Sequence, residues 1–225
     1  MPSALRQERT DLAIFTGAGL ACRRGERLVF RRLDFALPPG GALVLTGANG
    51  SGKSSLLRVM AGLTPPASGT LAWGGTDIAG DRGAHRLRLH FIGHADALKP
   101  VLAVREMLAF WAGMHGGAAV DVDGALARFR LEGLADWPCR LLSAGQRKRL
   151  ALARLVASAA SLWLLDEPAN GLDAAAVADL LAAVARHREG GGAIVLSTHT
   201  PLAIPGAEGL SLDDFQPPRR QEVPA

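Results

Sequence analysis

A glycine-rich segment followed by a lysine and two serines is the first place where residue types and spacing could do chemistry. Glycines let a loop wrap closely around an anion with its N–H groups turned inward, and a helix beginning there adds the positive end of its dipole. Gly, four residues and then Gly-Lys-Ser is the phosphate-binding P-loop pattern. It predicts nucleotide binding, with Lys53 on the β- and γ-phosphates and Ser54 as a ligand of Mg²⁺. The predicted binding residues are Gly47, Ala48, Asn49, Gly50, Ser51, Gly52, Lys53, Ser54 and Ser55.

Two adjacent acids at the end of an apolar run supply the second part of this chemistry. Asp166 and Glu167 follow residues 162–165, which predict a buried strand. At a strand end beside the P-loop, Asp166 would hold Mg²⁺, mostly through water, and Glu167 would orient or deprotonate the attacking water. Any buried strand can end in an acid, so the pair is informative because it lies downstream of a P-loop.

A second potential anion site precedes a basic helix, at Leu142-Ser143-Ala144-Gly145-Gln146. Ser143 and the backbone of Gly145 lie at the predicted helix N-terminus, where anions are stabilised. A simple helix cap would explain the serine but not the whole pentapeptide. One nucleotide cannot use both this site and the P-loop of the same chain, which indicates a second subunit.

Strands and helices alternate along the chain as they do in a parallel α/β sheet covered on both faces. We expect strands at residues 28–37, 42–46, 89–92, 162–165 and 193–197. Helices are expected from residue 53 to about 62, over most of 104–134, and at 146–157 and 174–188. The glycine-rich segment therefore follows a buried strand and opens a helix, the context that separates a P-loop from an ordinary glycine-rich turn.

Composition is that of a globular chain and argues against several classes of protein. The 225 residues suffice for one domain with a small helical subdomain, and 48% hydrophobic and 20% charged residues argue against wholesale disorder. Cys22 and Cys139 are too few for a disulfide framework and are expected to be reduced thiols. The net charge of +4 comes almost entirely from arginine and is attributed to composition bias, so nucleic acid is not a predicted partner.

Membrane association is expected only through another chain. Residues 1–10 have no apolar core of a signal peptide, and residues 150–165 contain Arg154 and are too short to span a bilayer. Residues 214–225 are expected to form a disordered tail.

Taken together, these motifs resemble the ABC ATPase family over roughly residues 10–213. The resemblance implies a P-loop NTPase α/β fold with an antiparallel β subdomain and an inserted helical subdomain at about 95–158. It also implies a head-to-tail homodimer, with each ATP between one P-loop and the partner's Ser143, Gly145 and Gln146. His199 resembles the family's switch histidine on the γ-phosphate, and residues 170–173 resemble its D-loop, which communicates across the dimer.

Two positions depart from the family pattern. His94 stands where the Q-loop glutamine is expected, and a neutral imidazole can still bond a water or a metal. The aromatic residue that stacks on adenine is missing before Val29; Arg24 could replace it by a cation–π contact, or could be a solvated arginine.

With these two departures, the sequence resembles one subfamily, the heme-exporter-type ATP-binding subunits of the bacterial cytochrome c maturation complex. This resemblance is carried by Cys22, Arg24, Arg27 and His94. It also rests on residues 142–146, which resemble the signature of the ABC ATPase family, and on residues 150–155 after them. It implies an ATPase bound peripherally at the cytoplasmic face of the inner membrane by permease subunits on separate chains.

Three other functions agree less well with the sequence. An ABC ATPase for another small cargo fits the motifs but not the two departures. A soluble ABC protein acting on DNA or the ribosome generally carries tandem cassettes or long insertions, for which 225 residues leave no room. A non-catalytic scaffold would not need Lys53, Asp166, Glu167 and His199.

Overall fold

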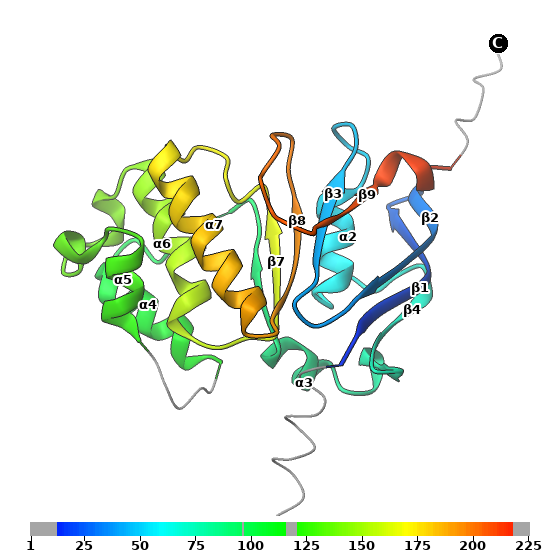
Figure 1. Cartoon of the computed structure of the whole chain (residues 1–225), viewed down its shortest axis with the longest axis horizontal. Helices are drawn as coiled ribbons and strands as arrows, with labels where there is room; N and C mark the ends of the chain where they lie inside the picture. Colours follow the sequence, from blue (N-terminus) through cyan, green and yellow to red (C-terminus); the bar gives the residue numbers. More distant parts are fainter. Residues whose placement is uncertain (1–12, 96, 116–120, 218–225) are drawn as a thin grey trace, which may run out of the picture.

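Two β-sheets and their covering helices make up the computed structural model, which describes residues 13–95, 97–115 and 121–217 (Figure 1). The strands are β1 Phe15–Arg24, β2 Arg27–Leu37, β3 Ala42–Thr46, β4 Ser68–Trp73, β5 Thr76–Asp77, β6 Leu89–Ile92, β7 Leu162–Asp166, β8 Ala193–Ser197 and β9 Glu208–Ser211. The helices are α2 Lys53–Met60, α3 Arg82–Leu87, α4 Val104–Gly113, α5 Val122–Arg128, α6 Ala144–Ala157 and α7 Ala174–Glu189. Four 3-10 turns are Ile78–Gly80, Glu132–Leu134, Cys139–Leu141 and Leu212–Phe215.

The central sheet has five parallel strands in the order β6-β7-β8-β3-β9, as the alternation of elements predicts. Alternate residues of each strand enter different cores: Trp163 and Leu165 pack with the helices α4 to α7, whereas Leu162 and Leu164 pack with α2 and the second sheet. Burial on both faces explains why the strands are nearly continuous apolar runs. Because the strands are parallel, the carboxyl ends of β3, β7 and β8 lie at the same edge of this sheet. The P-loop, the acid pair and His199 are all located at these strand ends.

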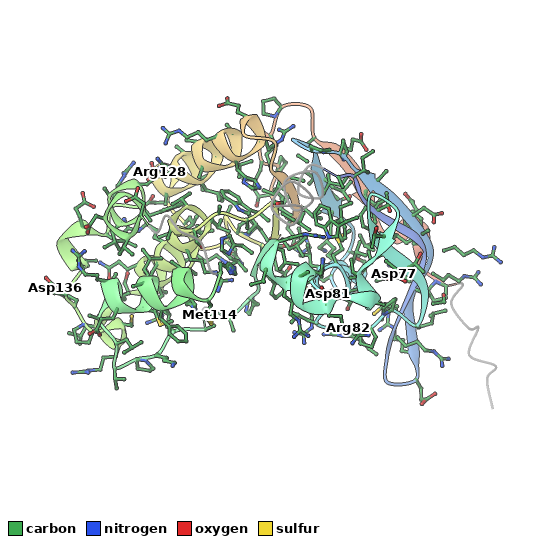
Figure 2. All side chains as sticks on the ribbon, turned by 90° about the horizontal axis from the view of Figure 1, so that it is seen from below. Asp77, Asp81, Arg82, Met114, Arg128 and Asp136 are labelled. Atoms are coloured by element: carbon green, nitrogen blue, oxygen red, sulfur yellow. The ribbon has the colours of Figure 1, made fainter. Side chains whose placement is uncertain are left out.

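An antiparallel sheet in the order β2-β1-β4-β5 covers α2 at one end of the molecule. Seen from below, Asp77, Asp81 and Arg82 lie at this end, while Met114 and Asp136 lie at the opposite, helical end (Figure 2). Sequence patterns did not identify β1 or β4. Their pairing contains register shifts between Ala18 and Ala21, which break the alternation of apolar residues that would have indicated strands.

The helical stretch expected at 104–134 is divided into α4, α5 and a 3-10 turn. Helix α5 begins after Asp121, whose side chain accepts a hydrogen bond from Gly124 N at 2.8 Å, an N-cap that starts a new helix. Helices α4, α5 and α6 pack around a core that includes Leu108, Leu126 and Leu150.

The predicted start of a disordered tail at residue 214 is wrong. The 3-10 turn Leu212–Phe215 contains the fully buried Leu212, and Phe215 packs on the core beside it, so apolar burial extends the fold past that residue. Residues 218–225 lie outside the described residues, as do residues 1–12, on which the expectations for the N-terminus fall. None of the helices in the described ranges has the length and apolar character needed to cross a membrane. Cys22 and Cys139 are buried free thiols.

Candidate nucleotide-binding site

The P-loop connects β3 to α2 through glycines with backbone angles that other residues rarely adopt. Gly50 has a φ of 80° and Gly52, the residue before the helix, has a φ of 113°. A Cβ on Gly52 would lie 2.6 Å from Val29 Cγ1, so a side chain there would collide with β2. The glycines thus permit the turn, and Gly52 also permits the close approach of β2, which the motif did not predict.

Lys53 begins α2 and is only 7% exposed. Its Nζ donates hydrogen bonds to Gly47 O at 2.7 Å and Ala48 O at 3.2 Å. The ammonium group is therefore held at the mouth of the loop by the carbonyls of the loop itself, where an anion bound by the loop would meet it.

The acid pair sits at the carboxyl end of β7, next to the end of β8. Asp166 Oδ1 accepts a 2.6 Å hydrogen bond from Ser197 Oγ. Glu167 has a positive φ of 50°, and one of its carboxylate oxygens, Oε1, lies 3.3 Å from His199 Nε2. The other, Oε2, accepts from His199 N at 3.3 Å. The predicted base and the predicted switch histidine are thus in contact.

One cavity of about 400 Å³ collects most of the predicted residues. Its lining comprises Arg24, Arg27, Val29, Asn49, Gly50, Gly52, Lys53, Ser54, Ser55, Asp166, Glu167 and His199. The hydroxyl of Ser54 and the carboxylate of Asp166 both line it, and hard oxygen donors of this kind suit Mg²⁺. The residues present therefore fit a nucleotide with its metal.

His94 lies on a neighbouring cavity of about 490 Å³ that shares Arg24, Ser54 and Asp166 with the first. Arg154 of α6 also lines it and donates a hydrogen bond to Phe91 O, at the end of β6. Burial lowers the pKa of Arg154 to about 10, which leaves it charged at neutral pH. This arginine connects the signature helix to the strand that leads to His94.

The signature residues Ser143, Gly145 and Gln146 lie at the N-terminus of helix α6. Ser143 Oγ accepts from Gln146 N at 3.2 Å, and Gln146 Oε1 accepts from Ser143 N at 2.8 Å, which is a capping box. Helix capping therefore accounts for the glutamine as well as the serine of the pentapeptide, although the sequence predicted a cap at the serine alone. Ser143, Gly145 and Gln146 do not line the two cavities described above, as far as the described residues show.

Asp213 is a contact of the P-loop that the sequence did not indicate. Its two carboxylate oxygens accept from Ala48 N at 3.3 Å and 3.1 Å, and Gln216 Nε2 donates to Oδ1 at 2.8 Å. Strand β9 pairs with β3 up to Ser211, which brings the C-terminal turn beside the loop. Asp213 lay one residue before the predicted tail, and no motif pointed to it.

Comparison with known proteins agrees with this geometry. The family model described as ABC transporter matches residues 30–170. The cytochrome c biogenesis ATP-binding export protein CcmA of Rhodospirillum rubrum is 55% identical over 205 residues, covering 91% of this chain and 88% of the relative. The protein of the same name from Paramagnetospirillum magneticum is 54% identical over 205 residues, covering 89% of this chain and 94% of the relative.

Solved structures show the same fold. A putative ABC transporter ATP-binding protein from Pyrococcus furiosus matches with a TM-score of 0.79 at 20% identity, covering 91% of this chain and all of that one. The fold is accordingly that of the ABC ATPases, with its parallel core, antiparallel sheet and helical region. On the family match and on these relatives, the chain belongs to the ABC transporter family.

Proposed function

We propose that this chain is the ATP-hydrolysing subunit of a membrane ABC complex that exports or delivers heme during c-type cytochrome biogenesis. The observation that carries the proposal is the cavity in which Lys53, Asp166, Glu167 and His199 meet, in a chain 55% identical to a protein named for cytochrome c biogenesis and export. The runner-up is an ABC ATPase for another small cargo, followed by a soluble ABC ATPase outside transport.

The proposed chemistry divides among the residues of the cavity. Loop N–H groups and Lys53 bind the phosphates, and Ser54 and Asp166 would hold Mg²⁺, which would supply positive charge against the phosphate oxygens. Glu167 orients the attacking water and accepts its proton, while His199, 3.3 Å from the Glu167 carboxylate, contacts the γ-phosphate. Arg24, which is exposed and lines the cavity, stacks on adenine.

Two copies of the chain are proposed to close around two ATP molecules. Ser143, Gly145 and Gln146 lie outside the cavity of their own chain, and they open a helix of 14 residues whose dipole favours an anion. These residues would complete the partner's nucleotide site.

The proposal for the surrounding assembly rests on membership of the ABC transporter family. The helices between β6 and β7 form a helical subdomain of about residues 95–158. Permease subunits on separate chains hold the dimer peripherally at the cytoplasmic face of the bacterial inner membrane.

His94 is proposed to replace the Q-loop glutamine, because it lines the cavity that contains Ser54 and Asp166. We expect His94→Gln to retain the ATPase activity of the membrane complex, because an amide can bond the same water or metal. His94→Ala should reduce the complex-stimulated ATPase rate several-fold while changing nucleotide affinity little. The measurement is ATPase activity of the reconstituted complex, with fluorescent ATP binding in parallel. Unimpaired activity in both variants would reduce His94 to an ordinary loop residue.

The proposed biology is tested in cells that depend on Glu167→Gln. The variant should fold and bind ATP but supply no hydrolysis, so c-type cytochromes should fail to mature while b-type cytochromes persist. Heme staining of denaturing gels detects only covalently bound heme, and absorbance spectra report b-type heme. Normal c-type bands would contradict the heme-delivery role and leave the ATPase assignment standing. Loss of both cytochrome types would instead favour another cargo.

A further inference from the structure

Ser197 forms hydrogen bonds with both Asp166 and Glu167, although it lines neither the P-loop cavity nor the neighbouring His94 cavity. It ends β8, is fully buried, and pairs in register with Asp166 at the end of β7. Residues paired on adjacent strands point to the same face of the sheet, which brings the serine hydroxyl to the carboxylate. Its Oγ donates to Asp166 Oδ1 at 2.6 Å.

The same hydroxyl oxygen accepts a hydrogen bond from Glu167 N at 3.0 Å. Glu167 is where the chain leaves the strand, and its φ of 50° is a conformation that residues other than glycine rarely adopt. A conformation of this kind persists when its surroundings hold it. The Ser197 hydroxyl is one such restraint, because it captures the first N–H beyond the strand and so fixes the turn.

This turn decides where the Glu167 carboxylate points. From it the side chain reaches His199, whose Nε2 and N lie 3.3 Å from the two carboxylate oxygens. Asp166, in turn, has one oxygen occupied by Ser197, which orients the carboxylate that lines the cavity with Ser54. A single hydroxyl thus sets the direction of two neighbouring side chains with different tasks.

We propose that Ser197 is a positioning residue for hydrolysis, which fixes Asp166 toward the Mg²⁺ position and Glu167 toward the attacking water through its one hydroxyl group. This inference rests on the function proposed above. It adds a residue that touches neither nucleotide nor water, and that no P-loop, acid-pair or histidine motif includes.

Removing the hydroxyl should impair chemistry more than folding. Ser197→Ala fits the space without collision but leaves the part-buried Glu167 N–H without this acceptor and deprives Asp166 of a donor. Misplacing catalytic groups by about 1 Å can cost about a hundredfold in rate, so we expect a kcat loss of about ten- to hundredfold. The Mg²⁺ concentration for half-maximal activity should rise as well, with little change in ATP affinity measured without metal.

Threonine and valine form a matched pair at this position, because they have nearly the same shape and only threonine carries the hydroxyl. Packing strain at this position therefore cancels between them, while the valine variant should melt at a lower temperature because only it leaves the Glu167 N–H unpaired. Ser197→Thr should recover most of the activity, and Ser197→Val should lose it as the alanine variant does. Ser158→Ala removes another buried hydroxyl, 3.4 Å from His90 Nε2 and remote from the acids, and should keep the kcat of the unaltered chain.

Two outcomes would overturn the inference: an alanine variant with unaltered kcat and Mg²⁺ dependence, or threonine and valine variants that are indistinguishable in both. A measurement that does not depend on hydrolysis tests the role of Ser197 separately from the proposed ATPase function. Mn²⁺ titration of the ATP complex, followed by electron paramagnetic resonance, should show weaker metal binding for the valine variant even if the purified chain turns over slowly.

Discussion

Glu167→Gln should stop ATP hydrolysis and leave ATP binding intact. The amide cannot accept the proton of the attacking water, whereas the P-loop and Lys53 are unchanged by the substitution. Glutamine is also nearly the same size, so its contact with His199 can be retained. In the proposed dimer, hydrolysis would separate the two copies, so we expect the variant to accumulate as a dimer when MgATP is added.

Size-exclusion chromatography with light scattering, with and without MgATP, measures this dimer, and phosphate release measures turnover. Glu189→Gln at the end of α7 makes the same chemical change outside the described site and should behave as the unaltered chain. A Glu167→Gln chain that hydrolyses ATP normally would contradict the role of Glu167 as base. A variant that stays monomeric in MgATP would contradict the shared nucleotide site.

Lys53→Ala should abolish hydrolysis by a different route, the loss of phosphate stabilisation. Among the described residues, Lys53 is the only lysine that lines the P-loop cavity, and it also donates hydrogen bonds to the loop carbonyls of Gly47 and Ala48. Removing one group that stabilises developing charge commonly costs about 2.7–4 kcal/mol, or about a hundred- to thousandfold in rate. We expect a loss at least that large, together with weaker ATP binding.

A matched control is Lys99→Ala, which removes the same charge from the ring of Phe110, outside the P-loop cavity. The isolated Lys99→Ala chain should hydrolyse ATP at the same steady-state rate as the unaltered chain. Near-normal turnover of Lys53→Ala would refute the assignment of this loop as the phosphate site.

The parallel core was predictable because its signals are local. Helix α2 begins at Lys53, as the P-loop pattern requires, and the short apolar runs became strands buried on both faces. The structure also brings Lys53, Glu167 and His199 to one cavity, although their catalytic roles stay predictions.

What the sequence could not predict depends on contacts between distant segments. Nothing near Ser197 in the chain distinguishes it from any serine at the end of a strand, and its importance arises from pairing with β7, 31 residues away. Asp213 is 165 residues from its partner Ala48. Strands β1 and β4 were not predicted because their irregular register interrupts the alternation of apolar and polar residues that indicates a strand.

Strand β3 carries the P-loop yet lies between β8 and β9, which are the last two strands among the described residues. During synthesis the phosphate loop therefore leaves the ribosome long before either neighbour exists to hold it. Nascent chains that end before Glu208 retain an apolar strand with one edge unpaired, a hazard for aggregation. Such long-range pairing also slows folding. A chain truncated before Glu208 would therefore lack the strand that supports one side of the P-loop strand β3.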